Sequence, residues 1–143
     1  MINAYFLYKI SNKLFNWGVP LLPKIVKGLI FLIYNSSIPY QCIIGSGSTF
    51  AYGGIAVVLH KRTVIGKKCI IGTNVTIGGK SNHYDVPSIG NNVKISAGAK
   101  ILGPVTIGNN VTIGANAVVI NDFPDNCVIA GIPAKIIKRI SEL

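Results

Sequence analysis

Residues 101–119 read Ile101-Leu-Gly-Pro-Val-Thr-Ile-Gly-Asn-Asn-Val-Thr-Ile-Gly-Ala-Asn-Ala-Val-Val119, with an aliphatic residue at every sixth position. A helix has a period of about 3.6 residues and a strand a period of two, so a period of six predicts that each hexapeptide is its own small structural unit. Such units stack, which predicts an all-β solenoid. The same spacing extends toward the N-terminus, and the full aliphatic set is Leu59, Ile65, Ile71, Ile77, Ile89, Ile95, Ile101, Ile107, Ile113 and Val119.

Two other positions of the hexapeptide support this prediction. A glycine follows most of the aliphatic residues, and we expect it at corners, where Gly adopts turn conformations at little cost. These glycines are Gly66, Gly72, Gly78, Gly90, Gly108 and Gly114. A smaller residue comes four positions after each aliphatic residue and is predicted to share the interior, at Thr63, Cys69, Val75, Val93, Ala99, Val105, Val111 and Ala117.

The segments on either side of the repeat differ from it. Residues 1–35 lack the period and are predicted to form a cap of one or two short amphipathic helices, interrupted by Pro20 and Pro23. Residues 36–133 are predicted to form the solenoid, and residues 134–143 a short helical or extended tail. Both flanking segments would cover the ends of the solenoid, whose backbone groups otherwise form a sticky edge.

Composition narrows the class of ligand. The chain has 143 residues, enough for one domain with a core, and its 14 Lys and Arg against 4 Asp and Glu indicate an anionic ligand. A basic helix, interleaved aromatic and Arg residues and zinc spacings are all absent, which argues against nucleic acid. A polyphosphate cofactor such as coenzyme A needs only a few well-placed cations and fits better.

The cysteines and the apolar segments bear on location. Cys42, Cys69 and Cys127 are widely spaced and are predicted to be reduced core residues. No signal peptide is recognisable and the longest apolar run is too short to cross a bilayer, which predicts a cytoplasmic protein. Lysines beside aromatic and aliphatic residues in the N-terminal segment are compatible with loose membrane association, although a cap that packs in a trimer explains them as well.

The repeat is broken at two places. Between Ile77 and Ile89 the aliphatic position falls on His83, and residues 79–88 have the composition of an excursion loop. A regular solenoid gains nothing from extruding a polar loop, so we interpret the loop as a binding element. The second break lies around Phe50–Gly54, where extra residues are inserted before the period resets, and His60 follows this reset.

The two breaks carry the only two histidines of the chain, His60 and His83. Either is a candidate general base for transfer of an acyl group from a thioester to a hydroxyl, since imidazole has a pKa near neutrality. Asp85 is predicted to orient an imidazole of its own or of a neighbouring chain. A solvated corner residue at His60 and a purely pocket-shaping loop residue at His83 are the alternatives. Asp122 and Asp125 flank a turn, where Asp has ordinary local roles.

The ordered features together resemble the hexapeptide-repeat acetyltransferases and, within them, the serine acetyltransferase branch. They are Ile77-Gly-Gly79, the loop, Pro87-Ser-Ile-Gly90, Ala97-Gly-Ala-Lys-Ile-Leu-Gly-Pro104, Ile113-Gly-Ala-Asn-Ala-Val-Val119 and Gly131-Ile-Pro-Ala-Lys135. The resemblance implies a left-handed parallel β-helix, a homotrimer and acetyl-CoA bound in the groove between two subunits. By similarity that groove is lined by Ala97, Gly98, Ala115, Asn116 and Lys135, with Lys135 near a phosphate. Gly78 and Gly79 complete the expected cofactor site, and a backbone N–H of one of them would bind the oxyanion.

The departures from this branch concern the acceptor. Longer serine acetyltransferases carry an Asp-His pair about where Tyr52-Gly53 stands, so His60 is expected to take over if it faces the same groove. The branch's Arg-His-Pro, which engages the serine carboxylate, is also altered, because no Arg stands between His83 and Pro87. The helical domain that pairs trimers is reduced to about 35 residues, so a simple trimer is expected.

These departures favour an O-acetyltransferase acting on a sugar hydroxyl of a surface polysaccharide or its precursor. Serine O-acetylation for cysteine biosynthesis and a purely structural β-helix are the alternatives. Direct transfer is expected because no Ser or Cys stands in a nucleophile setting. A zinc enzyme like the γ-class carbonic anhydrases would need three protein ligands, and two histidines predict no metal site.

Overall fold

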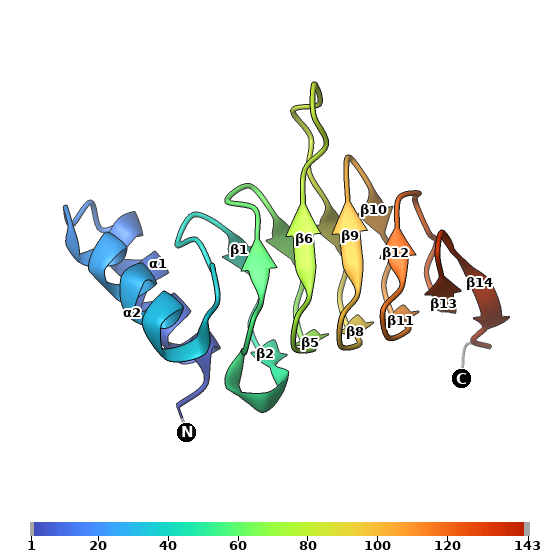
Figure 1. The fold of residues 1–143 in the computed structure, drawn as a ribbon, viewed down its shortest axis with the longest axis horizontal. Helices are drawn as coiled ribbons and strands as arrows, with labels where there is room; N and C mark the ends of the chain where they lie inside the picture. The colour runs from blue at the N-terminus through green and yellow to red at the C-terminus, as the bar shows by residue number, and fades with distance from the viewer. Residues whose placement is uncertain (1, 142–143) are drawn as a thin grey trace.

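A computed structural model describes residues 2–141 as an elongated triangular prism of short parallel strands. Two helices cover one end of the prism and a β-hairpin lies at the other, so the chain advances along the long axis from N-terminus to C-terminus (Figure 1). Every strand before the last hairpin is two or three residues long, as expected when each hexapeptide contributes one side of a coil.

Three sheets form the faces of the prism. The first contains β1 (Ile43–Ile44), β4 (Val64–Ile65), β7 (Ser88–Ile89) and β10 (Thr106–Ile107). The second contains β2 (Thr49–Phe50), β5 (Ile70–Ile71), β8 (Lys94–Ile95), β11 (Thr112–Ile113), β13 (Cys127–Gly131) and β14 (Ala134–Arg139). The third contains β3 (Val58–Leu59), β6 (Thr76–Gly78), β9 (Lys100–Leu102) and β12 (Val118–Val119).

The strand register locates the two breaks of the repeat. Ile44 pairs with Ile65, Ile65 with Ile89 and Ile89 with Ile107, which are separations of 21, 24 and 18 residues. Three hexapeptides per coil give 18 residues. The first coil therefore holds three extra residues, around the 3₁₀ turn η1 (Ala51–Gly53), and the second holds six extra residues in the loop. The coils therefore exceed 18 residues at the two places where the repeat is interrupted.

Aliphatic residues fill the interior of the prism as the period predicts. The repeating Ile, Leu and Val side chains are at most 3% exposed, and so are the smaller residues four positions later. Burial of each such side chain stabilises the fold by about 1.5–3 kcal/mol, and the stacked layers make one continuous core.

The glycines of the repeat have a different cause from the one that we expected. Gly66, Gly72, Gly90 and Gly108 do not have positive φ angles. A Cβ atom on Gly66 would lie 2.4 Å from the Gly90 carbonyl oxygen, so close stacking of successive coils excludes a side chain. The left-handed positions are occupied largely by asparagines, which tolerate this conformation, at Asn74, Asn92, Asn110, Asn116 and Asn126.

The N-terminal cap consists of two packed helices, α1 (Ala4–Asn16) and α2 (Leu22–Tyr34). Pro23 lies in the first turn of α2, where its missing N–H costs nothing. The cap is joined to the first coil by the Tyr8 hydroxyl, which donates to the Cys42 carbonyl at 2.5 Å. Among residues 2–141 no helix is long and apolar enough to cross a membrane.

The C-terminal segment is extended. β14 turns back along β13 in an antiparallel hairpin and covers the last coil of the second sheet. Of the two conformations predicted for the tail, the structure has the extended one up to Arg139, and residues 142–143 lie outside the described residues.

Three edges join the three faces. The first edge runs from the first sheet to the second. The second edge runs from the second sheet to the third and comprises residues 51–57, 72–75, 96–99 and 114–117. The third edge runs from the third sheet back to the first and comprises residues 60–63, 79–87, 103–105 and 120–122.

Candidate active site

Both histidines lie on the third edge. His60 directly follows β3, and its backbone N–H donates to the Ile77 carbonyl at 2.8 Å in the next coil. Its ring carbon Cδ2 is 3.9 Å from the position that a Cβ would take on Gly79, the residue at which the loop begins. Loop 79–87 projects away from the prism immediately after β6 and carries His83 (Figure 1). The two breaks of the repeat thus contribute their histidines to the same edge.

The hydrogen bond of His60 determines its tautomer. The backbone N–H of Arg62 donates to His60 Nδ1 at 3.1 Å, so Nδ1 carries a lone pair and the neutral ring has its proton on Nε2. Burial lowers the pKa of His60, and the charges of Arg62 and Lys61 lower it further. His60 is therefore a neutral hydrogen-bond donor at neutral pH, and its Nε2 lacks the lone pair that a base needs.

His83 has the opposite arrangement. Its Nδ1 lies 3.1 Å from the Ser81 carbonyl oxygen, and because a carbonyl only accepts, the proton must be on Nδ1. The Nε2 atom of the neutral ring then has a free lone pair. The ring is exposed near the tip of the loop, so an acceptor hydroxyl can reach it. This is the protonation pattern of a general base.

Asp85 is not bonded to either histidine within the described part of this chain. The Ser81 carbonyl has the orienting role on His83 that we expected from Asp85, because the loop turns back on itself between Lys80 and His83. Asp85 instead lines a small hollow of about 240 Å³ together with Arg62, Tyr84 and Val86. A role toward the histidine of a neighbouring chain stays a prediction.

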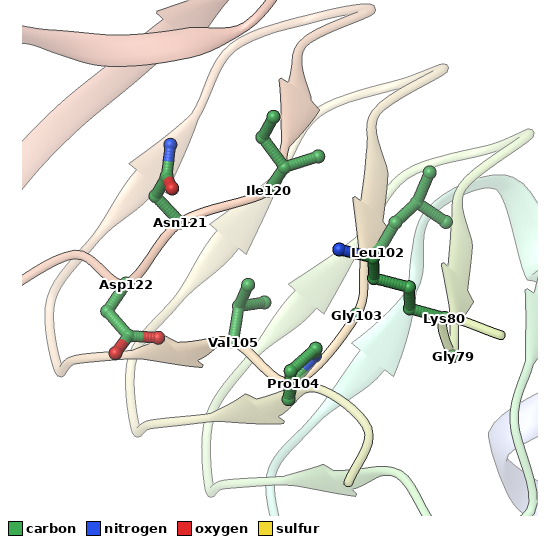
Figure 2. A pocket seen from close by; sticks show the side chains of 9 residues that line it. All are labelled: Gly79, Lys80, Leu102, Gly103, Pro104, Val105, Ile120, Asn121 and Asp122. Carbon is green, nitrogen blue, oxygen red and sulfur yellow. The ribbon is translucent and has the colours of Figure 1, made fainter. Parts of the chain in front are cut away.

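A groove of about 720 Å³ follows the third edge below the loop (Figure 2). Gly79 and Lys80 lie at one end of it, at the right in Figure 2, and the side chains of Leu102, Pro104 and Ile120 give it an apolar wall. The Lys80 side chain lies over Gly103, whose hypothetical Cβ would be 3.6 Å from Lys80 Cβ. The groove thus combines one cation with an apolar surface, which suits a ligand that has both anionic and apolar parts.

The two aspartates after β12 have structural hydrogen bonds. Asp122 lines the groove, but its Oδ1 accepts the Thr106 N–H at 2.7 Å. Asp125 Oδ1 accepts the Asn109 N–H at 2.6 Å. Each carboxylate therefore bonds to the preceding coil, 16 residues earlier in the chain, which is a longer-range structural role than the local turn role expected for these residues.

The predicted cofactor residues lie on two different edges. Gly78 and Gly79 lie at the third edge, where Gly79 lines the groove. The residues predicted by similarity lie at the second edge, in the turns that hold Ala97 with Gly98 and Ala115 with Asn116. Lys135 is exposed on β14, where it pairs with Ala130 beside the turn at Gly114. No single face of one chain presents all of these residues.

The expectation that His60 replaces the branch's Asp-His pair stays a prediction, because within one chain the two places lie on different edges. Tyr52 and Gly53 belong to η1 on the second edge, and Tyr52 is 83% exposed. Strand β3 separates them from His60, because the three inserted residues are accommodated on the second edge before the chain crosses to the third. His60 can therefore face the same groove as Tyr52 only across a subunit boundary.

All three cysteine thiols of the chain lie in the core. Cys42, Cys69 and Cys127 are fully buried and unpaired, as expected. Burial raises the pKa of Cys42 to about 12, and it also raises the pKa of the other two thiols. Among residues 2–141 no three His, Cys, Asp or Glu side chains gather as a metal site would require.

Two residues near the histidines were not singled out from the sequence. Arg62 reaches the loop, where its Cζ lies 4.0 Å above the Tyr84 ring, and Lys80 contributes the only cation that lines the groove among the described residues. Lys80 could have been noticed as a cation at the start of the excursion loop. The contact between Arg62 and Tyr84 spans 22 residues and depends on how the loop folds back, so no local signal indicates it.

Comparison with known proteins relates the chain to the hexapeptide-repeat transferases. The family profile described as "Bacterial transferase hexapeptide (six repeats)" matches residues 87–121. Solved structures that resemble the chain share its solenoid, and the predicted left-handed parallel β-helix with an N-terminal helical cap is confirmed.

The similarity then narrows to one kind of transferase. A serine acetyltransferase of Synechococcus elongatus is 35% identical over 138 residues, which are 95% of this chain and 56% of that protein. A serine acetyltransferase structure in complex with CoA has a TM-score of 0.85 and 33% identity, over 94% of this chain and 55% of that one. The Neisseria gonorrhoeae serine acetyltransferase in complex with serine has a TM-score of 0.87 and 29% identity, over 94% and 55% of the two chains.

These comparisons confirm the predicted resemblance to hexapeptide-repeat acetyltransferases of the serine acetyltransferase-like branch. The chain spans about half the length of the relatives that it matches. They do not support the preference for a sugar acceptor, because the relatives named here are serine acetyltransferases.

Proposed function

We propose that the protein is an acetyl-CoA-dependent O-acetyltransferase that transfers the acetyl group to the hydroxyl of serine. The observation that carries this proposal is His83, whose exposed ring keeps a free lone pair on Nε2 in the loop that begins at Gly79 and Lys80, two residues that line the third-edge groove. Similarity to serine acetyltransferases, including structures in complex with CoA and with serine, supports the donor and the acceptor.

His83 acts as the general base in this mechanism. Its Nε2 takes the hydroxyl proton as the acceptor oxygen attacks the thioester carbonyl, and the carbon–sulfur bond then breaks. The proton passes from His83 to the departing thiolate, which leaves as the free thiol of coenzyme A. No acyl-enzyme forms, and the three buried thiols with raised pKa values are poor nucleophiles.

The oxyanion of the tetrahedral intermediate needs donors near the base of the loop. The Gly79 amide is favoured, since it donates to no other group among the described residues and Gly79 lines the groove. His60 lies beside Gly79 and has its proton on Nε2, so it is a second candidate donor. In this scheme the two histidines have complementary roles, one accepting a proton and the other donating a hydrogen bond.

We place acetyl-CoA between two subunits of a homotrimer. The third edge of one subunit would supply Gly78, Gly79 and the groove, and the second edge of the next would supply Ala97, Gly98, Ala115 and Asn116. This arrangement is supported by the separation of the two residue sets in one chain, because a single ligand can touch both only across a boundary. Lys135 would meet a phosphate of the coenzyme.

A sugar hydroxyl is the second candidate acceptor. It is favoured by the absence of Arg between His83 and Pro87, since a neutral sugar needs no guanidinium for a carboxylate. Thiol release from acetyl-CoA, measured with L-serine, with L-serine amide and with nucleotide sugars or oligosaccharides, tests the choice. We expect faster thiol release with L-serine than with any other acceptor. Thiol release with sugars alone would instead identify the protein as a glycan O-acetyltransferase.

The helical cap supports a place at the cytoplasmic surface of an anionic membrane. Many of its outward side chains are apolar, and Trp17, Leu21 and Leu32 are each at least 67% exposed. Lys9 lies over the ring of Tyr5 and Lys13 over the ring of Trp17, and the first acidic residue of the chain is Asp85. An apolar surface surrounded by cations is complementary to anionic lipid headgroups.

Vesicle sedimentation tests this location. The protein should bind phosphatidylglycerol vesicles and not phosphatidylcholine vesicles, and Leu29→Ser with Leu32→Ser should abolish binding. A matched pair on the prism, Lys94→Ser with Lys100→Ser, should bind as the wild type does. The contrary result is a wild type that fails to bind vesicles and shows a molecular mass in solution that rises with protein concentration. If the leucine variant lacks that rise, the apolar face of the cap binds a second copy of the chain.

A further inference from the structure

Loop 79–87 is connected to the prism by very few interactions. Two of its three described hydrogen bonds are internal, from the His83 N–H to the Lys80 carbonyl and from His83 Nδ1 to the Ser81 carbonyl, both at 3.1 Å. In the described part of the chain, only the third leaves the loop. It runs from the Arg62 guanidinium to the Tyr84 carbonyl, at 2.5 Å.

Arg62 holds Tyr84 by a second interaction. Its Cζ lies 4.0 Å from the centroid of the Tyr84 ring, so the guanidinium stacks on the ring while it donates to the carbonyl of the same residue. No described carboxylate forms an ion pair with Arg62, and its Nε is buried without a hydrogen-bond partner. The guanidinium is thus committed to the loop and to no other part of the described chain.

The same residue also fixes the other histidine. The backbone N–H of Arg62 donates to His60 Nδ1 at 3.1 Å. Its side chain holds Tyr84, the residue next to His83. Arg62 therefore connects the corner that carries His60 with the loop that carries His83.

We propose that Arg62 is a positioning residue, which ties loop 79–87 to the third edge and so sets the place of the His83 ring relative to the groove. The inference rests on the proposed function in its catalytic part, but the tie itself is a property of the loop. When the tie is removed, the loop remains attached only at Gly79 and Pro87, and His83 samples many positions. Misplacement of a catalytic group by about 1 Å can lower the rate by roughly a hundredfold.

Hydrogen exchange of the loop amides, followed by mass spectrometry of the full chain, tests the tie without any assay of activity. Arg62→Met should exchange in peptides that cover residues 80–86 at least tenfold faster than the wild type. Lys61→Met is the matched control, because it removes one positive charge from the adjacent residue, which makes no described contact with the loop. It should leave exchange in the loop unchanged.

Variants of the partner residue separate the two interactions. Tyr84→Phe keeps the ring and the backbone carbonyl and should behave as the wild type. Tyr84→Ala loses the stacking and should accelerate exchange to an intermediate extent. Arg62→Lys keeps a charged donor but not the planar stacking group, so it should rescue part of the protection.

The catalytic consequence is a selective loss of turnover. With acetyl-CoA and the acceptor that supports thiol release, Arg62→Met should lower kcat by about tenfold to a hundredfold and leave the KM for acetyl-CoA within about twofold. Tyr84→Phe and Lys61→Met should retain the wild-type kcat. A change confined to the KM for acetyl-CoA would overturn the positioning role and make Arg62 a cofactor contact.

Two results would overturn the inference altogether. The first is wild-type exchange in the loop of Arg62→Met. Arg62→Met could instead accelerate exchange throughout the prism, and Tyr84→Ala then replaces it as the test, because Tyr84 is not a core side chain. The second result that would overturn the inference is wild-type exchange in the loop of Tyr84→Ala. Accelerated exchange in a protein that releases no thiol with any acceptor would uphold the tie and refute the proposed function alone.

Discussion

The two histidines of the chain differ in the ring nitrogen that carries the proton, Nε2 in His60 and Nδ1 in His83. A backbone N–H occupies Nδ1 of His60, whereas a carbonyl accepts from Nδ1 of His83. Sequence alone identifies both residues as candidates but not their tautomers, because the tautomer depends on one neighbouring backbone group in each case. The same limit applies to Arg62, whose contact with Tyr84 arises only when the loop folds back.

The lowered pKa of His60 predicts a pH dependence of stability. In the unfolded chain this residue titrates near 6.5, and in the folded chain it titrates lower, so the unfolded state takes up the proton first as the pH falls. The protein should therefore lose stability between pH 6.5 and the lower folded value, by a small amount because the ring is half-buried. Urea unfolding across this range should give a shallower loss for His60→Gln than for the wild type. A steeper loss in the variant would contradict the assignment.

Glycine in the repeat is predicted to be required for stacking. Gly66→Ala would place a Cβ 2.4 Å from the Gly90 carbonyl oxygen, and we expect the free energy of unfolding to fall by about 1–3 kcal/mol. Gly28→Ala is the control, since Gly28 lies inside α2 with no atom within 4 Å of the new Cβ, and it should raise stability by about 0.5–1 kcal/mol. Equal effects of both substitutions on the melting temperature would refute the stacking argument.

Strands and loop differ in how far the sequence predicts them. Every repeating aliphatic residue proved to be buried, because a period of six returns the same position of each hexapeptide to the interior. The loop was predictable as a break with polar composition. Its six extra residues equal one repeat length, so they leave the period in phase and place His83 where an aliphatic residue would fall. The sequence could not tell which residues lie on the second edge and which on the third, because this depends on where the three residues inserted at η1 are accommodated.

The loop is predicted to serve function and not folding. Deletion of residues 81–86 would leave Gly79-Lys80-Pro87-Ser88, which corresponds in position to Gly103-Pro104-Val105-Thr106 of the next coil. We expect the shortened chain to keep its melting temperature within a few degrees and its oligomeric mass, because a long exposed loop adds little to the core. Thiol release should fall to the level without enzyme. Retained activity in the shortened chain would exclude His83 and the loop from the site.

In the arrangement that we propose, one prism presents half of the acetyl-CoA site on each of two edges. The fold class and the acetyltransferase-like resemblance were predictable because they follow from local periodicity and ordered motifs. The assembly of the site was not, since it depends on how edges of separate chains meet. In the homotrimer that we propose, the third edge of one subunit would face the second edge of the next and so join the two halves.

Mixed oligomers test this assembly. His83→Ala inactivates the third edge and Ala115→Trp would block the second, so each variant alone should be inactive. When the two are unfolded, mixed in equal amounts and refolded together, about a quarter of the interfaces combine an intact third edge with an intact second edge, and activity should return to that extent. Mixing each variant with itself is the control. No recovery in the mixture would place both residues in a site within one chain.

The proposed role of His83 as the base for acetyl transfer to serine is tested by a thiol-release assay with two histidine variants. Thiol release from acetyl-CoA with L-serine should be acceptor-dependent in the wild type, fall by about a hundredfold or more in His83→Gln, and fall much less in His60→Gln. The expected product is O-acetylserine, identified by its mass. Acceptor-dependent release that survives in His83→Gln and disappears in His60→Gln would contradict the account.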